Sequence, residues 1–215
     1  MPWIQQLQSA NWSQVSYLAL CGYVLGCFTT GYYLVRFRTD QDLRALGSGS
    51  VGAKNAGRVL GWQGFLVTVI GDVFKGSLAV LIAKRFTQDD RVVVLTMIAV
   101  VIGHIWPVQL RLRGGKGIAT SLGALLIYDY KLIVAFLALF ACFFALYRKT
   151  VLPGLFAMAC LPLVSIYLGH EPAKIIGISI LTGLTLITHR KNLFEESFRF
   201  AERRNAASKT NHPEL

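Results

Sequence analysis

The chain consists mainly of long apolar stretches separated by short polar segments. Residues 15–35 carry no charged side chain, and neither do residues 92–110. A helix needs about 20 predominantly apolar residues to span a bilayer, and a soluble core could not accommodate six or seven such runs in a chain of 215 residues. The pattern therefore predicts an all-α polytopic integral membrane protein. We expect about seven transmembrane helices, at about 15–35, 62–83, 92–110, 118–128, 132–147, 151–168 and 174–188.

The fourth predicted span is too short to cross a bilayer unaided. We expect its helix to begin inside the preceding loop and to include part of 114–128. The fifth and seventh spans are also short, which favours local bilayer thinning. Without an internal repeat or a composition shift, residues 1–200 are expected to form a single transmembrane domain. The polar segment 201–215 is expected to be a disordered cytoplasmic tail.

The composition supports this interpretation, since only 15% of the residues are charged, against roughly 25% in an average soluble domain. The net charge is +11, but Lys and Arg lie in short loops between apolar runs, which indicates membrane topology and not nucleic-acid binding. With the N-terminus outside and the C-terminus cytoplasmic, five Lys or Arg fall in outside segments: Lys84, Arg85, Arg91, Lys131 and Lys174. Sixteen fall on the cytoplasmic side: Arg36, Arg38, Arg44, Lys54, Arg58, Arg111, Arg113, Lys116, Arg148, Lys149, Arg190, Lys191, Arg199, Arg203, Arg204 and Lys209.

The first segment with candidate chemistry is 46–61, LGSGSVGAKNAGRVLG, in the longest inside loop. Glycines allow positive φ angles and close backbone approach, so that backbone N–H groups and Ser hydroxyls can wrap around an anion. The alternative is a flexible connection between two helices. The basic residues of this loop favour the anion site.

The second segment is 103–120, GHIWPVQLRLRGGKGIAT, in which Pro107 is expected to break the preceding helix. GGKG then opens a new helix, and a Gly-rich turn with a Lys at a helix N-terminus favours anion binding. The spacing is not that of a Walker A loop. His104 is interpreted either as part of this site or as a helix-end histidine bonded to a backbone carbonyl.

The third segment, THRKN at 188–192, ends the last span; it either anchors the helix at the membrane surface or contributes to a site. Asp72 and Lys75 lie inside the second span at i and i+3, so they share a helix face. Charges at this depth are tolerated when they are paired. We interpret them as an internal brace or, alternatively, as groups that reach the site.

In their order and spacing, the motifs GSGSVGAKNAGR, GDVFKG, GHIWPVQLRLRGGKGIAT and HRKN resemble the bacterial acyl-phosphate-dependent glycerol-3-phosphate acyltransferase family. The resemblance extends from about residue 23 to residue 192. It implies an enzyme of the bacterial inner membrane, with its active site on the cytoplasmic face, that acts in phospholipid biosynthesis. This family transfers an acyl group from acyl phosphate to the 1-hydroxyl of glycerol 3-phosphate. The products are lysophosphatidic acid and phosphate.

The resemblance implies site residues at the matching positions. The catalytic residues are Lys116, His189 and Asn192. The substrate-binding residues are Ser48, Gly49, Ser50, Asn55, Arg58, Gly114, Gly115, Gly117, Thr120 and Arg190.

This sequence departs from the family pattern at several positions. Ser50 stands where Asn is usual and Lys54 where Thr is usual, while Glu195 and Glu196 replace a basic residue and Leu. Thr150 matches a family Ser before the sixth helix.

Acyl phosphate is an activated mixed anhydride, so the resemblance implies no cofactor and no metal. It implies glycerol 3-phosphate, acyl phosphate and membrane lipids as partners, no nucleic acid, and contact with the enzyme that produces acyl phosphate. Either His189 or the leaving phosphate could accept the proton of the attacking hydroxyl. The alternative functions are an anion transporter, or a weakened family member with a lipid-binding or regulatory role.

Overall fold

The computed structural model describes residues 11–148 and 150–194, and within these ranges every regular element is a helix. This confirms the all-α prediction. The helices are α2 (Trp12–Cys27), α3 (Thr30–Thr39), α4 (Ala53–Phe86), α5 (Asp90–Ile105), α6 (Ile118–Tyr128), α7 (Tyr130–Tyr147), α8 (Val151–Tyr167) and α9 (Pro172–Thr188), with short 3₁₀ turns η1 (Leu43–Ala45) and η2 (Val108–Leu110). The predicted tail at 201–215 lies outside the described residues.

Seven apolar helical segments of the described chain coincide with the seven predicted spans. Four are long and apolar enough to cross a membrane: Trp12–Thr39, Ala53–Phe86, Asp90–Leu110 and Tyr130–Tyr147. Three are shorter: Ile118–Tyr128, Val151–Tyr167 and Pro172–Thr188. The number of bilayer crossings and the side on which each terminus lies stay predictions.

Three predicted boundaries are wrong in detail. The first span is not one helix, because the extended residues Phe28 and Thr29 separate α2 from α3. The third span, predicted to reach residue 110, is α-helical only to Ile105, where the break expected at Pro107 is confirmed. The helix of the fourth span does not begin inside the loop, because Gly117 has φ +90° and α6 can start only after it.

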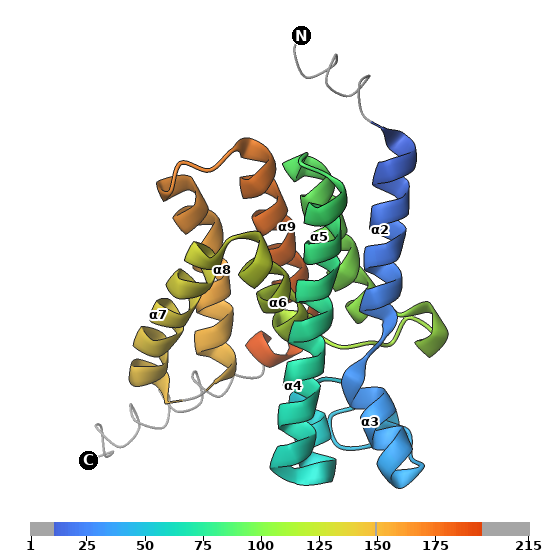
Figure 1. Cartoon of the computed structure of the whole chain (residues 1–215). Coiled ribbons are helices and arrows are strands. Elements are labelled where there is room, and N and C mark those ends of the chain that lie inside the picture. Colours follow the sequence, from blue (N-terminus) through green and yellow to red (C-terminus); the bar gives the residue numbers. More distant parts are fainter. Residues whose placement is uncertain (1–10, 149, 195–215) are drawn as a thin grey trace, which may run out of the picture.

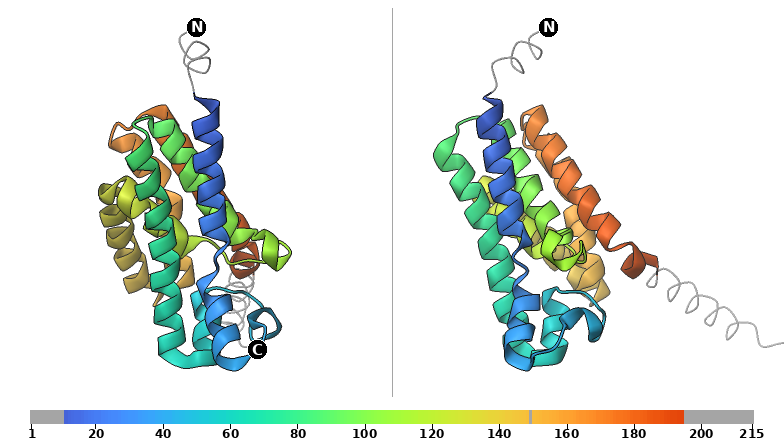
Figure 2. Two further views of the ribbon diagram at one scale, coloured as in Figure 1. Left: turned by 45° about the vertical axis from the view of Figure 1, so that its right-hand side comes forward. Right: turned by 90° about the vertical axis from the view of Figure 1, so that its right-hand side faces the viewer.

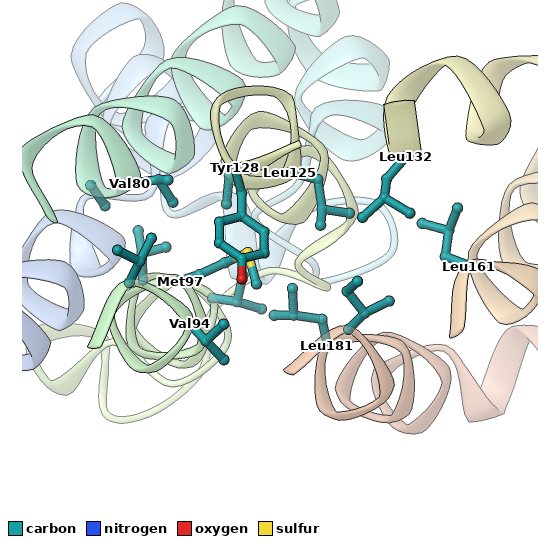
Figure 3. Close-up of a cluster of buried hydrophobic side chains, with 14 of the residues drawn as sticks. Val80, Val94, Met97, Leu125, Tyr128, Leu132, Leu161 and Leu181 are labelled. Atoms are coloured by element: carbon teal, nitrogen blue, oxygen red, sulfur yellow. The ribbon is translucent and has the colours of Figure 1, made fainter. Parts of the chain in front are cut away.

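The core lies where α4, α5, α6, α7, α8 and α9 meet, and Figure 3 shows its side chains pointing toward one another from these helices. Met97, Leu125, Leu132, Leu161 and Leu181 are completely buried there. Full burial of such side chains stabilises a packed helical bundle through close contact on all sides.

Two helix pairs approach so closely that their contacts require glycine. A Cβ on Gly26 of α2 or on Gly103 of α5 would collide with backbone of the opposite helix, and the same holds for Gly76 of α4 and Gly123 of α6. Small residues of this kind let helix backbones pack together where lipid gives no hydrophobic driving force. The α2–α5 and α4–α6 pairs therefore form a rigid frame for the loops at their ends.

The two ends of the bundle differ in chemistry. At the end where α2 begins, Asp129 contacts Lys174, and its Oδ2 lies 3.1 Å from Nε2 of His170. The opposite end carries α3, the loop before α4, η2 and the end of α9 (Figures 1 and 2). The three candidate segments all belong to this second end.

Candidate active site

The first segment is a loop folded around the side chain of Asn55. Its Oδ1 accepts a hydrogen bond from the Ser48 N–H at 2.9 Å, while Nδ2 donates to the carbonyls of Leu46 (2.8 Å) and Ser50 (2.9 Å). Asn55 is 1% exposed. The family resemblance assigns Asn55 to substrate binding, which stays a prediction, and its amide has partners in the loop backbone. The structure therefore gives Asn55 the task of shaping the loop.

The loop presents its small polar residues outward. Ser48 and Gly49 are exposed, and Gly49 has a positive φ of 71°. Ser50, half-buried, accepts a hydrogen bond from the Gly52 N–H through Oγ at 3.3 Å. Gly52 is the N-cap of α4, so the first segment contains a helix N-terminus, where backbone N–H groups favour an anion.

A sharp bend at Gly61 lies two turns further along α4. Gly61 has φ 70° and ψ −164°, a conformation essentially restricted to glycine. A Cβ on Gly57 would come within 2.9 Å of Cβ of Phe65, so the residues before the bend pack against those after it. This bend holds the exposed side chains of Lys54 and Arg58 beside the helical bundle.

The GGKG turn of the second segment is hydrogen-bonded to the C-terminal end of α5. The Gly114 N–H donates to the Ile105 carbonyl and the Gly115 N–H to the His104 carbonyl, each at 3.0 Å. A Cβ on Gly115 would fall on the His104 ring. These contacts fix the loop immediately before Lys116, which is half-buried.

A buried charged cluster lies under this loop. Lys75 Nζ is 2.9 Å from Asp72 Oδ1, 2.7 Å from His104 Nδ1 and 2.7 Å from the Phe28 carbonyl, which the break between α2 and α3 leaves without a helical partner. Asp72 and Lys75 are therefore an internal brace. They also reach the site indirectly, through the ring of His104 against Gly115. The His104 ring pairs with Lys75, and not with a backbone carbonyl as one interpretation of the sequence suggested.

The third segment is joined to the second by two hydrogen bonds. Lys116 Nζ donates to Asn192 Oδ1 at 2.6 Å, and Thr188 Oγ1 donates to the Lys116 carbonyl at 2.8 Å. The sequence analysis singled out Lys116 and Asn192 but gave Thr188 no role. Its position at the start of THRKN was the available signal. Arg190 is exposed beside them.

His189 is held in a defined orientation and charge state. Its Nδ1 lies 2.8 Å from the Thr185 carbonyl, so Nδ1 carries the hydrogen and donates it. Burial, together with the ammonium groups of Lys116 and Lys54, lowers the pKa of the His189 imidazole to about 4. At neutral pH the ring is therefore uncharged, and Nε2 is a hydrogen-bond acceptor.

Thr120 is the residue that the structure keeps away from this surface. It has no exposed area, and its backbone packs where α6 meets Gly76 of α4. Its hydroxyl is buried and has no hydrogen-bond partner within the described residues, and its role in substrate binding stays a prediction. Gly117, in contrast, supplies the positive φ that turns the chain from Lys116 into α6. Glu195 and Glu196 lie outside the described residues.

A further contact, not evident from the motifs, joins the chain just before the first segment to the second segment. Arg44, whose guanidinium forms a 2.6 Å ion pair with Asp42, donates from NH1 to the Leu110 carbonyl at 2.8 Å. It thereby ties the loop before α4 to the loop before α6. The assembled site presents several cations, exposed hydroxyls and helix N-termini around one neutral imidazole. Such a site can hold anions and accept a hydrogen bond from a nucleophile.

Comparison with known proteins gives consistent matches. The family model described as Glycerol-3-phosphate acyltransferase matches residues 16–196. Glycerol-3-phosphate acyltransferase 1 of Desulfitobacterium hafniense is 42% identical over 87% of this chain and 93% of its own length, and that of Bacillus cereus is 38% identical over 84% and 99%. The crystal structure of PlsY (YgiH), an integral membrane glycerol 3-phosphate acyltransferase in its glycerol 3-phosphate form, superposes with a TM-score of 0.80 at 29% identity. The match covers 86% of this chain and 92% of that one. The lysophosphatidic acid form gives a TM-score of 0.78.

Proposed function

The chain belongs to the glycerol-3-phosphate acyltransferase family, and from that premise we propose that its acyl donor is acyl phosphate. The protein is an integral membrane acyltransferase that acylates glycerol 3-phosphate in phospholipid synthesis. The products of the proposed reaction are lysophosphatidic acid and inorganic phosphate. The PlsY structures carry glycerol 3-phosphate and lysophosphatidic acid, the acceptor and the product of this reaction.

The observation that supports this donor is the convergence of Lys116, His189 and Lys54 at one end of the bundle. Acyl phosphate and glycerol 3-phosphate each carry a phosphate, so a site that brings them together must hold two anions close to each other. Two cations, Lys116 and Lys54, that both act on the pKa of the His189 imidazole meet that need. The remaining catalytic demand is small, because the acyl group is already activated and catalysis rests on positioning and charge stabilisation.

The proposed chemistry is a direct acyl transfer. The 1-hydroxyl of glycerol 3-phosphate attacks the acyl carbon, the bond from that carbon to the phosphate oxygen breaks, and phosphate leaves with the electron pair. Nε2 of His189 accepts a hydrogen bond from the hydroxyl and orients it. The hydroxyl proton passes to an oxygen of the leaving phosphate. Lys116 stabilises negative charge on a phosphate, and Asn192 positions its ammonium.

A donor assay tests this proposal. Purified protein in detergent is given labelled glycerol 3-phosphate with either palmitoyl phosphate or palmitoyl-CoA. We expect labelled lysophosphatidic acid with palmitoyl phosphate and none with palmitoyl-CoA, because the site offers phosphate-binding cations for a small head group. Product formation from palmitoyl-CoA alone would overturn the proposed donor.

We also propose that the site faces the cytoplasm of a bacterial cell, across its inner membrane, where the enzyme that produces acyl phosphate could deliver its product. The excess of Lys and Arg in the segments at this end supports that orientation. Single cysteines at Ala10→Cys and Thr210→Cys, in a cysteine-free background, are to be labelled with a membrane-impermeant maleimide on intact cells. We expect labelling at position 10 and protection at position 210. Labelling of both positions on intact cells would contradict an odd number of crossings.

A further inference from the structure

Lys54 connects two parts of the site that are distant in sequence. It lies in the first turn of α4, and its Nζ donates to the hydroxyl of Thr150, just before α8, at 2.6 Å. The family pattern has Thr where this chain has Lys54. This chain therefore places a positive charge where a hydroxyl is usual, and Thr150 holds that charge at the junction of α4 with α8.

An open groove of about 610 Å³ begins at this contact. Its polar part is formed by Lys54, Arg58 and Thr150, and its apolar part by Trp62, Phe65 and Phe140. Trp62 and Phe65 are 72% and 43% exposed, so the groove opens along the side of the bundle next to the bend in α4. A groove lined by two cations and by three aromatic side chains matches an anionic single-chain amphiphile in both charge and polarity.

The two phosphates of the reaction differ in the group that each one carries. Glycerol 3-phosphate has no apolar part, whereas the acyl donor carries its chain directly behind the phosphate. The ammonium of Lys116 is hydrogen-bonded to Asn192 and that of Lys54 to Thr150, and both lower the pKa of the His189 imidazole. Of these two ammonium groups, only that of Lys54 lines the groove.

We propose that Lys54 binds the phosphate of the acyl donor, with the beginning of the acyl chain in the groove. This assignment rests on the proposed function and makes Lys54 a specificity-determining residue of this chain. Binding requires the ammonium to share or exchange its Thr150 partner for a phosphate oxygen.

The substitution Lys54→Thr tests the head-group contact. We expect KM for palmitoyl phosphate to rise about tenfold, equivalent to about 1.4 kcal/mol, because a charge-assisted contact is lost. KM for glycerol 3-phosphate and kcat should stay within about twofold of the wild-type values, as loss of ground-state donor binding predicts. The matched control is Lys131→Thr, an exposed lysine at the opposite end of the bundle.

Hexadecyl phosphate, a non-reactive analogue, makes the test independent of the reaction. Its binding to purified protein, measured with radiolabelled analogue, should weaken about tenfold in Lys54→Thr and remain unchanged in Lys131→Thr. If wild-type protein binds the analogue through Lys54 but uses only palmitoyl-CoA, the proposed donor fails and the anion site stands. Three outcomes in Lys54→Thr would each overturn the assignment. They are a rise in KM for glycerol 3-phosphate in place of the rise for palmitoyl phosphate, a change confined to inhibition by lysophosphatidic acid, and unchanged binding of hexadecyl phosphate.

The apolar part of the groove has its own test in Trp62→Ala, at a side chain exposed enough for its removal to leave the fold intact. We expect this variant to lose most of the preference for hexadecyl over octyl phosphate. Lys54→Thr should weaken both analogues equally and keep that preference. An unchanged chain-length preference in Trp62→Ala would remove the acyl chain from the groove.

Discussion

Replacement of Lys116 by Met is expected to lower kcat about 10²–10³-fold, the range found when one pre-organised donor to developing charge is removed. Lys116 is half-buried, and its ammonium is hydrogen-bonded to Asn192. Its carbonyl accepts a hydrogen bond from Thr188, and the two preceding glycines are hydrogen-bonded to the end of α5. Met keeps the apolar stem and removes only the charge. The measurement is turnover of palmitoyl phosphate at saturating glycerol 3-phosphate in purified protein.

Two further variants make this result specific. Lys116→Arg keeps the positive charge but not the compact ammonium, so we expect it to recover only part of the activity. Lys131→Met removes an exposed charge at the opposite end and should turn over like wild-type protein. Equal melting temperatures of Lys116→Met and wild-type protein would show that insertion and folding are intact. Near wild-type turnover of Lys116→Met would exclude Lys116 from the site.

The parts of the fold that were predictable are those governed by local sequence. Apolar runs located the helices, Pro107 located the end of α5, and the i, i+3 spacing paired Asp72 with Lys75. The break after α2 was not predictable in this way. It is stabilised by Lys75 and Gln109, which donate to the carbonyls of Phe28 and Cys27 from 47 and 82 positions further along the chain.

In the site, too, local sequence pointed to individual residues but not to the long-range contacts between them. Motifs pointed to Lys116, His189 and Asn192, but the contact between Lys116 and Asn192 spans 76 positions and depends on how α9 packs against α5 and α8. Asn55 and Thr120, which the family resemblance assigns to substrate binding, show what a motif does not reveal. Each lies in a motif, yet each is buried and acts on the loop or the helix contact that presents the neighbouring residues. Residue identity alone does not separate a side chain that contacts substrate from one that positions it.

The pH dependence of His189 is expected to differ from that of an ordinary histidine. Because burial lowers the pKa of its imidazole to about 4, the ring stays neutral as the pH falls from 8 through the usual value of 6.5. Nε2 therefore remains a hydrogen-bond acceptor, and it becomes protonated only as the pH approaches 4. The substrate phosphates titrate near pH 6. The ratio of wild-type to His189→Gln kcat/KM, taken at each pH, cancels that effect and should be flat from pH 8 to about 5.5.

The substitution series at His189 then separates orientation of the hydroxyl from general-base catalysis. The Nδ1 hydrogen bond to the Thr185 carbonyl leaves only Nε2 for the substrate, and the amide oxygen of Gln can replace that acceptor. If His189 orients the hydroxyl, His189→Gln should raise KM for glycerol 3-phosphate and leave kcat largely intact. If it is the general base, His189→Ala and His189→Gln should both lose about 10²–10⁴-fold in kcat. We expect the first result, because acyl phosphate is already activated and brings its own phosphate oxygens to the attacking hydroxyl. A large loss of kcat in His189→Gln at saturating glycerol 3-phosphate, with KM unchanged, would establish His189 as the base instead.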